Sequence, residues 1–128
     1  MATEIESMLG EKKATEQWLN IPNSSRLHEL YEFQGTNHIN DYLQSHSELI
    51  NFLLESHYHL EKYFGTSAKF ELEVVHDPEA QHEQLIVYIN TSLSVDEALI
   101  RLDRFDNDWF LDHVNWIGHF INFNLKTV

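Results

Sequence analysis

Five side chains between positions 103 and 113 could bind a metal ion and activate water. They are four aspartates and one histidine: Asp103, Asp106, Asp108, Asp112 and His113. Carboxylates and imidazoles hold divalent metals, and a metal-bound water is a hydrolytic nucleophile. If one helix runs through this segment, Asp108 and Asp112 lie one turn apart and, with His113, are the candidate metal ligands. This arrangement would suit a metal-dependent hydrolase or nuclease.

The same aspartates also fit a solvated helix surface. They lie off the apolar stripe that runs from Val95 to Trp109, so water would cover them in any case. Arg101 and Arg104 are spaced to pair with Asp108 and other acids along the helix. We favour this interpretation, which predicts no catalytic residue and no cofactor. The candidate interaction surface then consists of Asp103, Asp106, Asp108 and Asp112.

The chain is rich in histidine, with nine residues among 128. On one predicted helix Glu55 and His59 are four residues apart, as are His57 and Glu61, and such pairs can hold zinc from one face. The pattern supplies neither pair with a third and fourth ligand, so we interpret His57 as a histidine at the edge of the core. The absence of cysteine excludes disulfides, thiol catalysis and thiolate metal sites.

The charge balance restricts the partners. Eight basic residues stand against 21 acidic ones, a formal net charge of -13 with histidine neutral. Such a chain repels phosphate backbones and anionic lipid surfaces, so we expect no nucleic acid and no membrane partner. A basic protein would complement the charge. Residues 1–10 lack the pattern of a secretory signal, and no apolar run reaches the roughly 20 residues of a membrane span, so we expect a soluble, cytoplasmic protein.

The chain has the length of one domain, residues 1–128, with three parts. We expect residues 1–23 to form a peripheral arm and residues 24–65 to be helical. In the helical part, residues 25–33 have a short helical pattern, and Ser45 with Glu48 fits a capping box before a long amphipathic helix. Residues 68–125 are expected to form a β-β-α-β unit.

The β-β-α-β unit is predicted from changes of period. Residues 69–74 alternate between apolar and polar, and residues 85–89 form a second, more apolar strand. Ser94 and Glu97 fit a capping box at the start of the next helix, and Gly118 precedes a last strand. The predicted fold is therefore α+β, with a three-stranded, mainly antiparallel sheet and helices packed on one face.

Several runs of this unit resemble a group of small uncharacterised bacterial proteins, mainly cyanobacterial. The runs are residues 70–75, 77–79, 88–93, 102–106 and 109–112. The resemblance covers about residues 68–125 and implies the β-β-α-β unit behind a variable helical front. It implies no activity, although a role in protein interaction would be in keeping with the group. Asn122 and Asn124 stand where the group has acids.

These observations favour a non-enzymatic protein-interaction or regulatory module. It would bind another protein, a basic one or a second copy of itself, through the acidic helix face or an exposed strand edge. A homodimer that covers one edge of the sheet is the simplest version. The alternatives are the hydrolase or nuclease described above and a small-ligand module with an aromatic pocket between the front helices and the sheet.

Overall fold

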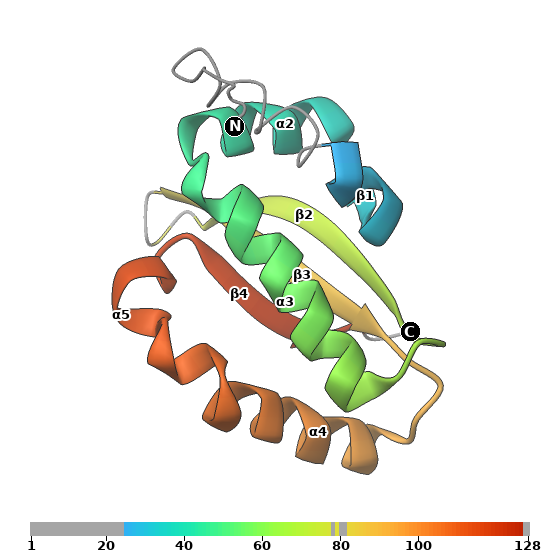
Figure 1. The fold of residues 1–128 in the computed structure, drawn as a ribbon. Helices are drawn as coiled ribbons and strands as arrows, with labels where there is room; N and C mark the ends of the chain where they lie inside the picture. Colours follow the sequence, from blue (N-terminus) through green and yellow to red (C-terminus); the bar gives the residue numbers. More distant parts are fainter. Residues whose placement is uncertain (1–24, 78, 80–81, 127–128) are drawn as a thin grey trace, which may run out of the picture.

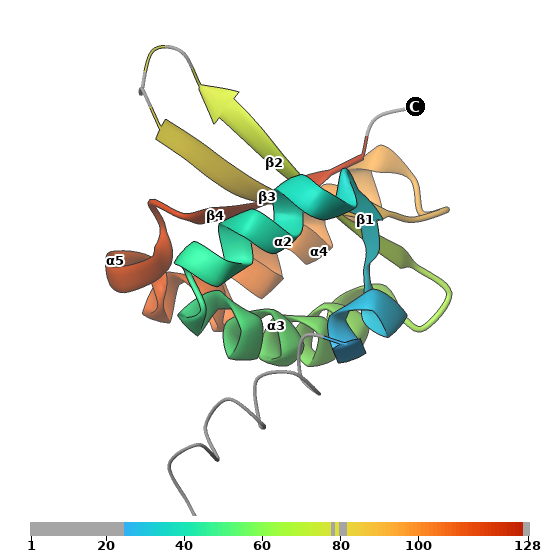
Figure 2. The same cartoon turned by 90° about the horizontal axis from the view of Figure 1, so that it is seen from above.

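The structure, a computed structural model, describes residues 25–77, 79 and 82–126. The predicted arm at residues 1–23 lies outside the described residues. The rest has one mixed sheet with the order β1-β2-β3-β4, and the helices cover one of its faces (Figures 1 and 2). Residues 25–30 are helical. The other elements are β1 Glu32–Gln34, α2 Thr36–Ser45, α3 Glu48–Phe64, β2 Lys69–Asp77, β3 His82–Asn90, α4 Val95–Asp108, η1 Phe110–Asp112, α5 Val114–Ile117 and β4 Ile121–Leu125.

The prediction of an α+β fold is confirmed, but the three-stranded, mainly antiparallel sheet is wrong. The structure has four strands, and only β2 and β3 are antiparallel. β1 runs parallel to β2, with Phe33 opposite Leu72, and β3 runs parallel to β4, with Val87 opposite Phe123. β1 was hidden because three residues are too few to show an alternating period, and they follow directly on a helical pattern.

Glycine and serine mark two of the helix ends as predicted. Gly65 ends α3 with φ +85°, a conformation that favours glycine. Ser94 begins α4, and its hydroxyl accepts a hydrogen bond from the Glu97 amide at 3.2 Å. The capping box predicted at Ser45 and Glu48 is wrong. Ser45 is the last residue of α2, and α3 begins after Ser47 without a side-chain cap.

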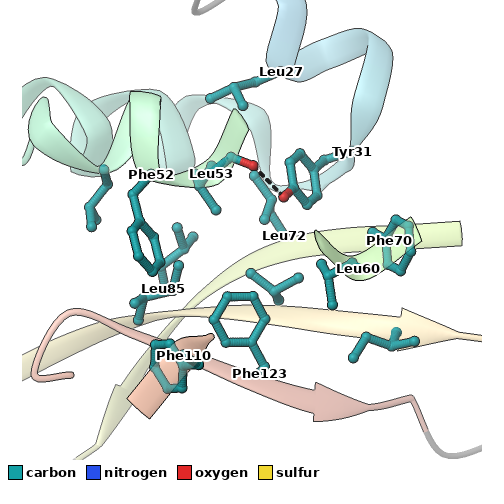
Figure 3. Packing of buried hydrophobic residues seen from close by; sticks show 14 of the residues in the cluster. Leu27, Tyr31, Phe52, Leu53, Leu60, Phe70, Leu72, Leu85, Phe110 and Phe123 are labelled. Atoms are coloured by element: carbon teal, nitrogen blue, oxygen red, sulfur yellow. Dashed lines mark hydrogen bonds between the residues drawn. The ribbon is translucent and has the colours of Figure 1, made fainter. Parts of the chain in front are cut away.

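The core lies between the sheet and the helical layer. The inward side chains of the three longer strands alternate with outward ones, which is why Leu72, Leu85 and Val87 are fully buried. From the helical side, Leu53 and Leu60 of α3 fill the space above them (Figure 3). The buried Tyr31 hydroxyl donates to the Leu53 carbonyl at 2.6 Å, and this hydrogen bond joins the helical segment of residues 25–30 to α3. These side chains lie between the helices and the sheet, which is where the small-ligand alternative places its aromatic pocket.

A carboxylate is buried on the opposite face of the sheet. Glu71 of β2 is 4% exposed, although no described helix covers that face. Lys126, just after β4, reaches across β3 and donates to both Glu71 carboxylate oxygens at 2.7 and 2.8 Å, and Gln34 of β1 donates at 3.3 Å. A buried charge needs such partners. The contact therefore links β1, β2 and the end of β4 across the sheet.

Candidate functional site

The predicted cluster of Asp103 to His113 does not lie on one helix. α4 ends at Asp108, and Trp109 leaves helical geometry with φ -138°. The change turns the Trp109 ring into the core, where it is 7% exposed and stacks on Phe52 with centroids 4.9 Å apart. Asp112 then falls in η1. The one-turn spacing of Asp108 and Asp112 required one helix through the segment, and this condition is not met, because α4 ends at Asp108 and Asp112 lies in the next element.

The candidate metal ligands are turned toward other partners. Asp108 accepts a hydrogen bond from the Tyr63 hydroxyl at 2.7 Å. The Nδ1 atom of His113 lies 3.0 Å from the Trp109 carbonyl oxygen, and its ring packs against the indole. Within the described part of the chain, no three histidine, aspartate or glutamate side chains are grouped so that they could hold a metal ion. The donors of the metal alternative are present by type but do not converge.

Asp103 and Asp106 remain together on α4. Asp103 is exposed and accepts a hydrogen bond from the Asn107 side-chain amide at 3.3 Å. Asp106 is partly buried one turn away, and burial, with the Asp103 carboxylate as a second cause, raises its pKa to about 6. The environment of Asp106 therefore opposes its charge.

Large apolar side chains project into solvent from the same helix. Val95 is 70% exposed, Leu99 51% and Ile100 50%. Helical spacing places Leu99 beside Asp103 and on the same side as Asp106. We call the surface formed by these five side chains the α4 face: Val95, Leu99, Ile100, Asp103 and Asp106. The sequence pattern identified its aspartates but assigned Val95 and Leu99 to the buried stripe.

Arg101 lies on the other flank of α4, which faces α3. Its Nε donates to the Glu97 carboxylate at 2.9 Å, and its Nη1 donates to the Tyr63 carbonyl at 3.1 Å. This confirms that Arg101 pairs with an acid along the helix, but that acid is Glu97, and Asp108 accepts its hydrogen bond from Tyr63 instead. Because Arg101 is held against α3, its charge is directed away from the α4 face.

The edges of the sheet are poorly suited to pairing with another strand. At one edge, Ile121 and Phe123 of β4 are only 1% and 4% exposed, backbone included. The Asn122 side-chain oxygen also accepts the Phe123 amide hydrogen at 2.9 Å. At the other edge, β1 has three residues, and its exposed Glu32 would meet an incoming strand with a charge. Short, charged or self-capped edges resist strand addition.

A second site, which the sequence did not reveal, lies between α2, the start of β3 and the turn before β4. It is an open depression of about 410 Å³ that we call the α2 pocket. Its lining includes two acidic residues, Asp41 and Glu83, and one phenylalanine, Phe120. Four of the nine histidines also line it: His38, His46, His82 and His119. Histidine abundance was the only signal in the sequence, because these side chains come from three segments that only the fold brings together.

Tyr42 and His46 join the three segments of the α2 pocket. The Tyr42 hydroxyl donates to the Phe120 carbonyl at 3.0 Å and to the Glu83 carbonyl at 3.3 Å. Burial, followed by the Glu83 and Glu48 charges, raises the pKa of Tyr42 to about 12, so it stays a donor at neutral pH. The His46 ring packs between Tyr42 and Phe120, at 4.4 and 4.8 Å. On the rim, His38 Nε2 and the Glu83 carboxylate are 2.7 Å apart.

The histidines of α3 occupy the edge of the core. His57 packs edge-on against Tyr31 and Phe70, and its side chain is 13% exposed. Burial lowers its pKa, and the charge of Glu61, 4.0 Å away, opposes that shift. This position agrees with the interpretation of His57 as a histidine at the edge of the core.

No protein-family model, curated protein or solved structure matches the chain. The resemblance of residues 68–125 to the bacterial group therefore rests on the sequence pattern alone. In the part of the chain that the structure describes, no helix has the length and apolar character needed to cross a membrane.

Proposed function

We propose that the protein is a non-enzymatic interaction module that binds a basic protein through the α4 face. The observation that carries this proposal is the exposure of Val95, Leu99 and Ile100, each 50% or more, beside Asp103 and Asp106. Exposed aliphatic side chains gain free energy when a partner covers them, at about 25 cal/mol per Å² of apolar surface. The neighbouring carboxylates would select lysine and arginine on that partner.

The net charge supports the same partner. At -13, the protein attracts basic proteins over a distance and repels acidic ones, itself included. This repulsion, together with the protected edges of β1 and β4, favours a basic partner over a homodimer formed through a sheet edge. The dispersed positions of Asp108, Asp112 and His113 favour interaction over hydrolysis.

An affinity capture from lysate of the source organism tests the proposal. We expect the wild-type protein to retain a basic protein that 0.5 M salt releases. At this salt concentration the Debye length lies between about 8 Å, its value at 0.15 M, and about 3 Å, its value at 1 M, so attraction between exposed charges is largely screened. Leu99→Gln should lose that protein. Tyr58→Gln is the matched control, because Tyr58 is 70% exposed on a different helix, α3.

The carboxylates are tested in the same way. Asp103→Asn combined with Asp106→Asn should weaken capture, whereas Glu29→Gln combined with Glu55→Gln removes the same charge from exposed positions elsewhere. If the two double variants and Leu99→Gln all capture the partner as well as the wild-type protein does, the α4 face is excluded as the binding surface. A retained partner that is acidic or insensitive to salt would contradict the charge argument.

A further inference from the structure

The α2 pocket is separate from the α4 face and has a different chemistry. Its lining residues belong to α2, the start of β3 and the turn before β4, and none belongs to α4. Tyr42, 6% exposed, is hydrogen-bonded to two of the three segments, so the pocket is built before any ligand arrives.

The permanent charges of the pocket have one sign. Asp41 and Glu83 are the acidic side chains in its lining, and no lysine or arginine lines it. The histidines, when neutral, add hydrogen-bond acceptors and donors without adding charge. An anion entering the pocket would meet two carboxylates in a protein that already carries a net charge of -13.

We propose that the α2 pocket binds a small organic cation, an amine or a guanidinium, through the carboxylates of Asp41 and Glu83 and the ring of Phe120. Hydrogen bonds between a charged N–H group and a carboxylate are about twice as strong as neutral ones. An aromatic ring at the same site adds a favourable contact with the cation or with its apolar stem. The volume of about 410 Å³ accommodates a ligand with several carbon atoms.

A divalent metal fits the pocket less well than an organic cation. A metal needs at least three ligand atoms at short, fixed distances, and the described residues form no such group. An ammonium or guanidinium group carries several donors and can engage the Asp41 carboxylate and the Glu83 carboxylate separately, although the Glu83 carboxylate also lies 2.7 Å from His38 Nε2. The cation could be a free amine or the side chain of a lysine or arginine in another polypeptide, and the chemistry is the same.

The test is a titration followed by ¹H–¹⁵N NMR at pH 8, with N-acetylarginine amide, spermidine and a basic hexapeptide as separate probes. We expect amide shifts concentrated in α2, the start of β3 and residues 118–120. The neutral isostere N-acetylcitrulline amide should produce none of them. Binding of the small probes would identify the cation itself as the ligand, and binding of the peptide alone would identify a polypeptide source.

Variants decide whether the carboxylates act as proposed. Asp41→Asn, at an exposed position of α2, should weaken binding about 5–10-fold, as expected for one charge-assisted hydrogen bond. Glu55→Gln makes the same charge change on α3 and should alter binding less than about twofold. Leu99→Gln should leave this binding unchanged, which separates it from the function proposed for α4. Shifts outside the pocket, equal binding of the citrulline compound, or full affinity of the folded Asp41→Asn protein would each overturn the proposal.

Discussion

The imidazole of His59 stacks on the indole of Trp109, with ring centroids 4.7 Å apart and an angle of 20° between their planes. His59 belongs to α3, and Trp109 directly follows the last residue of α4, so the stack joins the two long helices. Phe52 lies against the same indole, at 4.9 Å. Trp109 is therefore held by packing from α3 at the point where α4 stops.

Replacement of Trp109 by alanine should destabilise the fold strongly. Because the indole is 7% exposed, we expect Trp109→Ala to lower the free energy of unfolding by about 3–5 kcal/mol. Trp116, 51% exposed, is the matched control, and Trp116→Ala should lower it by about 1 kcal/mol or less. Urea unfolding followed by circular dichroism measures both. Similar losses for the two variants would show that Trp109 is not part of the core.

Asp106 should make the protein less stable as its carboxyl ionises. Its pKa is raised to about 6 in the folded state from 3.8, so the folded state favours the protonated form. Its contribution is therefore present below pH 3.8 and is lost as the pH rises through about 6.

The difference between Asp106→Asn and wild type isolates that contribution. The variant should gain little near pH 4 and about 1 kcal/mol near pH 7, a value reduced from the full shift because Asp106 is only partly buried. Urea unfolding at several pH values measures the difference. A gain that does not grow between pH 4 and 7 would contradict the raised pKa.

His57 should have the opposite effect. Burial lowers its pKa below 6.5, so the unfolded chain binds the proton more tightly than the folded protein. Its stability contribution is present above pH 6.5 and is lost as the pH falls through the lowered folded pKa. We expect the His57 imidazole resonance to titrate below pH 6.5 in the folded protein and near that value in urea. Titration at the same pH in both states would refute this.

The contact between Lys126 and Glu71 should stabilise the C-terminal end of β4. Removing the ammonium by Lys126→Met leaves the carboxylate of Glu71, 4% exposed, with the Gln34 amide as its one remaining side-chain donor among the described residues. We expect a loss of stability larger than that of Lys62→Met, which removes an exposed lysine from α3. The double variant Glu71→Gln and Lys126→Met should recover part of the loss. A double-mutant cycle measures the coupling, and independent, additive effects would contradict the role of the pair.

The sequence by itself determined the elements that carry a clear local period. α3, the two long strands and α4 were predicted because burial on one face imposes a spacing of 3.6 or 2 residues, and that spacing is visible without the fold. The cap at Ser94 and the end at Gly65 were predicted for the same reason, since each depends on neighbouring residues. The placement of Asp103 and Asp106 on one helix was also predicted, because the period of that helix is visible in the sequence.

Only the tertiary structure decided the features that depend on distant residues. β1 exists because it pairs with β2, which is distant in the sequence. The side chains of Gln34 and Glu71, 37 residues apart, are hydrogen-bonded between the two strands. α4 stops at Asp108, where the Trp109 ring packs against Phe52 and His59 of α3, residues distant in the sequence. Val95, Leu99 and Ile100 follow the apolar spacing but remain exposed, since no described element covers them. The four histidines of the α2 pocket meet because three segments fold against one another. Local spacing records which residues share a face, but the fold alone determines what that face contacts.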